Sequence, residues 1–494
     1  MITVISFICF LAVFVLIGVL SVIANKHTSR DYLLASSNIK PWLVALSAIA
    51  TNNSGYMFIG MIGFTYSYGL SSIWLMVGWI VGDFIMSFLV HKQLRETTGR
   101  THTRSYGGIL AKWNDTEFTR LRGLVGLITV VFLGTYAAAQ LSAGSKALYV
   151  LFDWPYETGA IVGAVMVVAY CVAGGIRASI WTDAAQSFVM LFAMALMLYI
   201  SYQTVGGWSA LTTQLNQVSD TYMNWFPPDL DLGAPVGPFL FVLGWLFAGF
   251  AIVGQPHIMV RFMTMDSPRH MTRARAYYYA WYFIFYAMTI GAGLSARLLL
   301  PESATFDAEL ALPTLARDLL PPVLVGLVLA GMFAATMSTA DSLIISCTAA
   351  ITRDFGIKWL TGYWTTKLIT ILITAFALVV ALYGPDSVFV LVVLAWGAMG
   401  STFGPILMVY ALGQRPNEWL TIAMALGGLG TMLVWRELGW DDTIYEAAPG
   451  IMAGLAIFGV GKLFDLLVPD TTIVDSPKEL PESPATQARE HGEN

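Results

Sequence analysis

The stretch LAGMFAATMSTADSLIISCTAAITRD, residues 329–354, determines how the rest of the chain is interpreted. It is apolar and long enough to cross a lipid bilayer as one helix. Ser338, Thr339 and Ser342 nonetheless share one helical face, and Asp341 borders that face. Hydroxyl groups between membrane helices often serve packing alone. A carboxylate in hydrocarbon is costly, however, so this oxygen-rich face predicts a site for a small hard cation.

Composition places the chain among membrane proteins that cross the bilayer many times. Of its 494 residues, 57% are hydrophobic and 12% are charged. Its three cysteines lie in apolar segments without metal-ligand spacing, which indicates buried thiols. We expect an all-α membrane protein with about 13 transmembrane helices. The apolar spans lie at residues 3–24, 41–66, 71–91, 123–150, 157–175, 184–205, 236–258, 275–297, 322–350, 365–384, 387–412, 419–436 and 448–467.

The lysine and arginine positions predict the orientation of these spans. If the N-terminus lies outside, all but four of the 26 lysines and arginines fall in loops that face the cytoplasm. Arg261 is counted among these inner-loop residues. The loop at 206–235 carries aspartates and no basic residue, as an outer loop does. We therefore expect a multi-pass protein of the plasma (bacterial inner) membrane, with residues 1–467 in the membrane domain and 468–494 a disordered cytoplasmic tail. The four exceptions are Lys146, Arg297, Arg317 and Arg436.

The second span contains a segment that is unsuited to a continuous helix. Its residues 50–55, ATNNSG, are dense in side chains that hydrogen-bond the local backbone. Freed backbone groups survive in a membrane only where they line a cavity or lie buried in protein. The segment predicts a break that presents carbonyl groups to an ion or solute. The alternative is an intact helix whose polar side chains pack on its neighbours.

The seventh span, GWLFAGFAIVGQPHIMVRFM, contains a second predicted break. Pro256 removes a helix hydrogen bond, and Gly254 loosens the same region. His257 stands alone without ligand spacing, so we interpret it as a packing residue. The two broken spans are five helices apart, as expected for inverted repeats formed by helices 2–6 and 7–11. These core repeats would occupy residues 41–205 and 236–412.

Three further polar residues lie in or near apolar spans. Asp183, in RASIWTDAAQ, is expected at a cytoplasmic helix start, where it either caps the helix or contributes to a cation site. Tyr136 either offers its ring and hydroxyl to the centre of the bundle or packs between helices. Asp83, in GWIVGDFIM, is an intramembrane carboxylate to which the sequence assigns no role.

Three stretches in this order, SIWTDAAQ, GQPHIMVRFM and MFAATMSTADSLIISCTAAITRD, resemble the sodium:solute symporter family. The resemblance is nearest to its sodium/proline branch and runs over residues 5–465. It implies the leucine-transporter-type 5+5 inverted-repeat fold with extra helices, and Na⁺ as the coupling ion.

The resemblance also implies the site residues. Sodium ligands would be the carbonyls of Ala50, Asn53 and Ala335 with the hydroxyls of Ser338 and Thr339. Asp183, Asp341, Ser338 and Ser342 correspond to a second sodium in some members; otherwise one of the two carboxylates stays protonated. The solute would contact Asn52, Ser54, Gly55, Tyr136, Trp245 and Pro256.

The chain departs from the proline branch in two places. Asn52 stands where that branch has an important aspartate, which changes the charge of the sodium region. Extra residues lie between Trp245 and Pro256, and an ungapped alignment to Pro256 places Ala248 and Ile252 where two aromatic residues would fall. Coupling to sodium is thus a firmer expectation than proline as the solute.

The sequence favours a symporter over a membrane sensor, a channel or an enzyme. No nucleotide-binding loop is recognisable, since GVGKL at 459–463 lacks the rest of that motif. A symporter driven by the sodium gradient, importing proline, another amino acid or a small carboxylate, is therefore the first expectation. A membrane sensor would need a signalling domain that the tail of about 27 residues is too short to hold. A channel would need a continuous wet pore, and an enzyme a nucleophile–base pair or metal cluster. Sodium, the solute and the lipid bilayer are the expected partners, and nucleic acid is not.

Overall fold

The computed structural model describes residues 1–22, 33–230, 232–300 and 306–467. The expected disordered tail at 468–494 lies outside these residues. Within them the chain is helical, and its extended backbone pairs in a single isolated bridge between Ile39 and Met265. The all-α expectation is confirmed.

The helices follow the apolar spans closely. A kink at Gly175, with φ of 60°, divides α10 and separates the expected fifth and sixth spans. Short 3-10 and π-helical turns connect several elements. The α-helices are α1 (Ile2–Val22), α3 (Pro41–Asn52), α4 (Gly55–Phe58), α5 (Gly60–Tyr68), α6 (Ile73–Met86), α7 (Lys92–Thr101), α8 (Tyr106–Ala111), α9 (Thr119–Phe152), α10 (Tyr156–Val205), α11 (Gly207–Leu215), α12 (Val236–Phe250), α13 (Pro256–Met263), α14 (Met271–Leu299), α15 (Ala311–Leu319), α16 (Pro322–Ala349), α17 (Tyr363–Tyr383), α18 (Val388–Ala411), α19 (Glu418–Glu437) and α20 (Ala447–Leu467).

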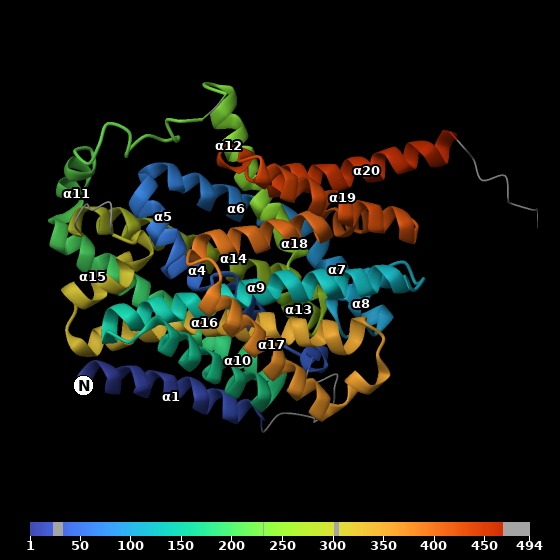
Figure 1. Cartoon of the computed structure of the whole chain (residues 1–494), viewed down its shortest axis with the longest axis horizontal. Helices are drawn as coiled ribbons and strands as arrows, with labels where there is room; N and C mark the ends of the chain where they lie inside the picture. Colours follow the sequence, from blue (N-terminus) through green and yellow to red (C-terminus); the bar gives the residue numbers. More distant parts are fainter. Residues whose placement is uncertain (23–32, 231, 301–305, 468–494) are drawn as a thin grey trace, which may run out of the picture.

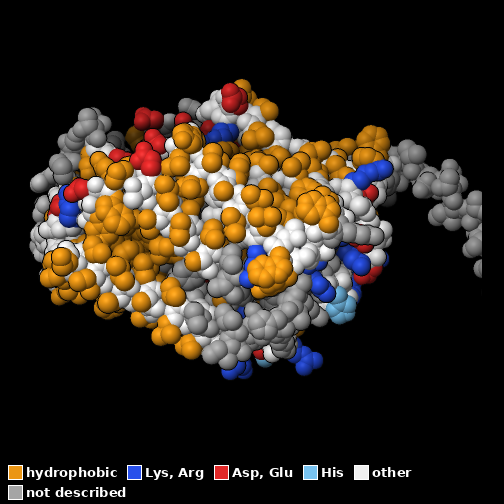
Figure 2. Space-filling view, turned by 60° about the horizontal axis from the view of Figure 1, so that its bottom comes forward, with side chains coloured by type: hydrophobic (Ala, Val, Ile, Leu, Met, Phe, Trp, Pro, Cys, Tyr) orange, Lys and Arg blue, Asp and Glu red, His pale blue; other side chains and the backbone are white. Residues whose placement is uncertain are grey.

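Ten helical segments of the described chain are long and apolar enough to cross a membrane, and two shorter apolar helices accompany them. The expected number of thirteen spans remains a prediction. Figure 2 shows hydrophobic side chains over the middle of one face, with lysines and arginines gathered toward one end. Large hydrophobic side chains such as Phe188, Phe192 and Val379 are exposed on the molecule. A bilayer, rather than water, suits such a surface.

Both predicted helix breaks are present. The second span is divided between α3 and α4 at Asn53 and Ser54. In the seventh span, α12 tightens into a 3-10 turn, Ala251–Gly254, and Gln255 is extended before Pro256 begins α13. A proline is favoured at the first position of a helix, because its missing N–H would have no intrahelical partner there.

The two ends of the bundle differ in their connections. α11 and α15 lie at one end with the N-terminus, and α7 and α8 lie at the other (Figure 1). At the first end, the Tyr222 hydroxyl donates to the carbonyls of Thr65 and Tyr66, which fastens the 206–235 loop onto α5. The 206–235 segment and the end of α5, both predicted to face outside, are therefore joined at this end of the molecule.

Glycine allows α6 and α12 to pack backbone against backbone. A Cβ added at Gly82 would collide with the Leu246 carbonyl oxygen and with Gly249, and one added at Gly249 would collide with the Trp79 carbonyl oxygen. Small residues permit such close approach between membrane helices. α16, by contrast, is surrounded by α1, α9, α10 and α17, which makes it the centre of the other half of the bundle.

We predict that Gly82→Ala destabilises the protein by about 1–3 kcal/mol, because the added methyl group has no space between α6 and α12. Thermal unfolding in detergent measures the effect. Gly430→Ala in α19 is the matched control, since a Cβ at Gly430 meets nothing within 4 Å. Equal melting temperatures for Gly82→Ala and the wild type would contradict the close packing.

Candidate functional site

The break between α3 and α4 is buried in the protein. Asn53 leaves the helical region with φ of −86° and ψ of 65°, and the Ser54 hydroxyl accepts the N–H of Tyr56. A Cβ at Gly55 would lie 2.6 Å from Thr336 Cγ2 and 2.9 Å from Ala143 Cβ. Glycine at this position therefore lets the break fit between α9 and α16.

The hydroxyl face of α16 packs on this break, as the sequence predicts. Thr339 Oγ1 donates to the Thr51 carbonyl at 2.9 Å, and Thr51 Oγ1 lies 3.3 Å from Ser342 Oγ. The break and the face therefore form one polar region inside the bundle. Ala50 and Ala335, whose carbonyls are expected ligands, are both fully buried beside it.

The donors at the break suit a sodium ion. Ser338 Oγ and Asn53 Oδ1 are buried and make no hydrogen bond. The last carbonyls of α3 lack intrahelical partners because the helix ends there. Oxygen donors are what a small hard cation requires. The described residues contain no group of three or more His, Cys, Asp or Glu side chains that would hold a metal.

A second polar cluster joins α10, α13 and α16, and its centre is Arg261. This guanidinium is completely buried, lies 3.3 Å from Asp183 Oδ2 and donates to Ser179 Oγ at 2.8 Å. It also donates to Ser342 Oγ. Asp341 Oδ1 in turn accepts the hydroxyls of Ser179 at 3.1 Å and Ser342 at 2.9 Å. A permanent positive charge thus lies within the group of residues considered for a second sodium.

Two sequence interpretations in this region are wrong. Asp183 does not cap a helix, because it lies inside α10, eight residues after the Gly175 kink, and accepts the Ser47 hydroxyl at 2.6 Å. Arg261 does not lie in an inner loop, because α13 continues through it and buries it. The helix of the sixth span starts at the kink rather than at the polar SIWTD segment.

Three of the expected solute residues lie together. Tyr136 OH is 3.2 Å from Ser54 Oγ, and the Tyr136 ring meets the His257 ring edge-on at 5.5 Å, directly after Pro256. The Gly55 N–H, however, donates to Gln140 Oε1 at 2.9 Å. Gln140, which the sequence does not single out, therefore occupies the first free N–H of α4.

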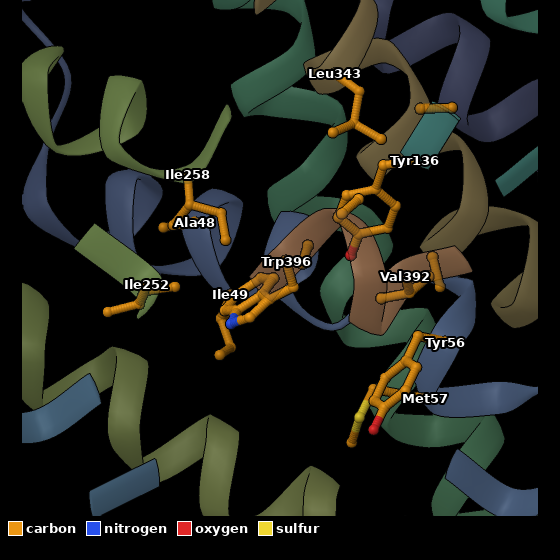
Figure 3. Packing of buried hydrophobic residues seen from close by; sticks show 14 of the residues in the cluster. Ala48, Ile49, Tyr56, Met57, Tyr136, Ile252, Ile258, Leu343, Val392 and Trp396 are labelled. Carbon is orange, nitrogen blue, oxygen red and sulfur yellow. The ribbon is translucent and has the colours of Figure 1, made fainter. Parts of the chain in front are cut away.

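Trp245 lies away from this group. It stacks on Tyr445 with ring centroids 5.1 Å apart and on Trp79 at 6.0 Å, and the Trp79 ring is in turn 5.7 Å from that of Tyr56. Trp396 is nearer to the seventh-span break, since its indole N–H donates to the Ala248 carbonyl at 2.8 Å. Figure 3 shows Tyr56, Tyr136 and Trp396 in one buried cluster.

Asn52 faces α14 rather than Ser54. Its Nδ2 donates to Tyr278 OH at 2.7 Å. Arg261, Gln140 and Tyr278 are thus the residues that sequence reasoning missed around the site. The sequence does place an arginine, Arg261, five residues after a helix-breaking proline, which was a signal that could have been used. No comparable signal marks Gln140 or Tyr278.

A buried ionic contact joins several elements at the end of the bundle that holds α11 and α15. Lys146 Nζ lies 2.7 Å from Glu309 Oε2 and 2.9 Å from Asp307 Oδ2. Glu309 also accepts the N–H groups of Val388 and Phe389 at the start of α18. An acidic side chain stabilises a helix N-terminus. These contacts connect α9, α18 and the segment before α15.

Comparison with known proteins agrees with this geometry. The chain is 28% identical to the sodium/proline symporter of Escherichia coli over 454 residues, which cover 89% of this chain and 88% of that protein. It is 27% identical to the high-affinity proline transporter of Bacillus subtilis over 444 residues, 87% of this chain and 92% of that one.

Solved structures establish the fold. A Na⁺-coupled sialic acid symporter in a substrate-bound outward-open state superposes with a TM-score of 0.78 at 19% identity, covering 94% of this chain and 98% of that one. MhsT in complex with L-phenylalanine gives a TM-score of 0.54 at 14% identity, covering 84% and 98%. The leucine-transporter-type fold that the sequence predicts is confirmed.

The family model for the sodium:solute symporter family matches residues 32–425. Sodium is the coupling ion of this family. With two broken helices, a buried oxygen face opposite one of them and a family match over most of its length, this chain belongs to the sodium:solute symporter family.

Proposed function

We propose that this symporter imports proline, or a closely similar small zwitterion, together with one sodium ion. The observation that carries the proposal is the α3 break against the α16 hydroxyl face, where Thr339 already bonds the Thr51 carbonyl. Ala50, Asn53, Ala335, Ser338 and Thr339 are the proposed sodium ligands. The similarity to two bacterial proline transporters supports the choice of solute.

Arg261 supports a single coupled sodium. Two carboxylates that face one site repel each other unless a cation lies between them. The Arg261 guanidinium supplies that charge permanently, since an arginine is not deprotonated in proteins. A second sodium near Asp183, Asp341 and Ser342 would have to displace it from its four hydroxyl and carboxylate partners. One guanidinium balances one carboxylate, so the ion pair of Arg261 with Asp183 is an alternative to the second sodium and is compatible with the hypothesis that Asp341 stays protonated.

One sodium is sufficient to concentrate a neutral solute. A membrane potential of about 100 mV contributes roughly 2.3 kcal/mol per charge. A tenfold sodium gradient adds about 1.4 kcal/mol. Together they support accumulation of several hundredfold. Import also requires the orientation expected from the basic residues, with the N-terminus outside and the C-terminus in the cytoplasm of a bacterial cell.

The solute is proposed to lie beside Ser54, Tyr136 and Pro256. The Tyr136 ring offers an apolar surface to a pyrrolidine or similar body, and its hydroxyl already contacts Ser54 Oγ. The carboxylate of the solute would approach the 53–55 break, where it competes with Gln140 for the Gly55 N–H. Trp245, which stacks on Tyr445 and on Trp79, remains a predicted solute residue.

We predict that Ser338→Ala and Thr339→Ala each raise the sodium concentration for half-maximal uptake by about tenfold, because each removes one oxygen ligand. Uptake of labelled proline into proteoliposomes at varied sodium, with potassium keeping the ionic strength constant, measures this. Ser346→Ala is the control, since its hydroxyl bonds the Ser342 carbonyl of its own helix. Unchanged sodium dependence in both Ser338→Ala and Thr339→Ala would contradict the proposal that these hydroxyl groups bind sodium.

We predict a Hill slope near one for sodium in the wild type, and no change of that slope in Asp341→Asn. Arg261→Gln should abolish uptake, because it leaves buried carboxylates without a cation at a cost of about 3–5 kcal/mol. Adding Asp183→Asn to Arg261→Gln should recover part of the protein's stability. A wild-type slope near two that falls toward one in Asp341→Asn would instead establish a second coupled sodium.

We predict that Tyr136→Ala raises the KM for proline more than tenfold, whereas Tyr136→Phe, which keeps the ring, raises it only a few fold. Initial rates at saturating sodium separate KM from the maximal rate. Unlabelled proline, other amino acids and small carboxylates compete in the same assay. If proline fails to compete for any sodium-dependent flux, another solute takes its place.

A further inference from the structure

Asp83 is a buried carboxylate that the proposed transport site does not use. It lies in α6 within a predicted membrane span and is completely inaccessible. Both oxygens accept tyrosine hydroxyls from α14, Oδ2 that of Tyr278 and Oδ1 that of Tyr279, each at 2.8 Å. Among the described residues, no lysine, arginine or histidine forms an ion pair with it. A carboxylate at such a position is costly and is therefore a candidate functional group.

Tyr278 connects Asp83 to the break in α3. The Tyr278 oxygen also lies 2.7 Å from Asn52 Nδ2. The Tyr278 hydroxyl donates to Asp83 Oδ2, and a tyrosine hydroxyl has a single proton. Tyr278 therefore gives its proton to Asp83 and must accept from Asn52.

This chain of two hydrogen bonds determines the orientation of the Asn52 carboxamide. The amide nitrogen is directed to Tyr278, so the amide oxygen occupies the other branch of the side chain. Distances alone leave the oxygen and nitrogen of an asparagine ambiguous, whereas a fixed donor chain assigns them. Without the Asp83 carboxyl group as acceptor, the Tyr278 proton could turn toward Asn52, and the amide would lose its fixed orientation.

Asn52 is the last residue of α3 and directly precedes Asn53, a proposed sodium ligand. The proposed ligands are all neutral oxygens, so they supply no formal charge to balance sodium. Asp183 is neutralised by its ion pair with Arg261. The Asp83 carboxyl group, two hydrogen bonds away from α3, has no ion pair among the described residues, and hydrogen bonds that share a member strengthen one another along such a chain.

We propose that Asp83 is a positioning residue of the transport site, which acts through Tyr278 to orient the Asn52 carboxamide and raise the affinity for sodium. The inference rests on the proposed function, because it requires sodium to bind at the α3 break. The structural alternative is that Asp83 only fastens α6 to α14. Tyr279 distinguishes the two roles, because it bonds Asp83 as closely as Tyr278 does but has no bond to Asn52.

The test uses the purified full-length protein and the variants Asp83→Asn, Tyr278→Phe and Tyr279→Phe. A ligand that binds only the folded state raises its melting temperature. The melting temperature is measured in rising NaCl, with KCl keeping the total salt constant, which gives the sodium concentration for half of the stabilisation. This readout does not require the transported solute to be known.

We expect Asp83→Asn and Tyr278→Phe to raise that sodium concentration by about tenfold, the loss expected for one buried hydrogen bond. Tyr279→Phe should stay within about twofold of the wild type. If Asp83→Asn does not fold, Tyr278→Phe, which removes one oxygen atom, decides the question alone. Equal sodium affinity in Tyr278→Phe and the wild type, or equal losses in the two tyrosine variants, would overturn the proposal. Absence of any sodium-specific stabilisation in the wild type would instead contradict the proposed sodium site itself.

Discussion

Backbone groups freed inside a membrane must find partners within the protein, and the break after Asn52 depends on this constraint. Thr339 satisfies the Thr51 carbonyl, and the Gln140 side chain satisfies the Gly55 N–H. α16 and α9 must therefore lie against the break, and Gly55 permits their approach. Ser338 Oγ and Asn53 Oδ1 are buried without a hydrogen-bond partner, so both oxygen atoms are available to coordinate a coupled ion.

Charge is the second constraint on the centre of the bundle. Arg261 is surrounded by an aspartate and three serines from three different elements, so its burial is compensated by hydrogen bonds as well as by Asp183. Breaking a buried pair of this kind is expensive, although forming it adds little net stability. Its role is thus better described as holding α10, α13 and α16 in one arrangement than as strengthening the fold.

Local chemistry was sufficient to predict the breaks, whereas contacts between distant segments were not. Adjacent Asn52, Asn53, Ser54 and Gly55 oppose a helix wherever they occur, and Pro256 does so by its ring, so both interruptions could be placed from the sequence. Periodicity likewise placed the hydroxyl face of α16.

The errors arose where a residue's partner lies on another helix. Arg261 looks like a loop residue because basic side chains usually mark the inner ends of spans. Its partners come from α3, α10 and α16, which no local pattern reveals. The link from Asn52 to Asp83 is of the same kind. Asn52 stands where the resemblance to the proline branch implies an aspartate, and the fold places another carboxyl group, that of Asp83, within two hydrogen bonds of it.

The close packing of α6 on α12, through Gly82 and Gly249, has a consequence for the movement of helices during transport. Transporters with inverted repeats alternate by rocking one group of helices against another. Helices in backbone contact move as one body, and α14 packs on both α3 and α6. The hydrogen bonds that connect Asn52 to Asp83 would then stay intact during the movement, because they lie within that body. The hydrogen bonds of Arg261 to α10 and α16 would have to break and form again. Reorientation would thus require Arg261 to exchange its hydrogen-bond partners on these helices.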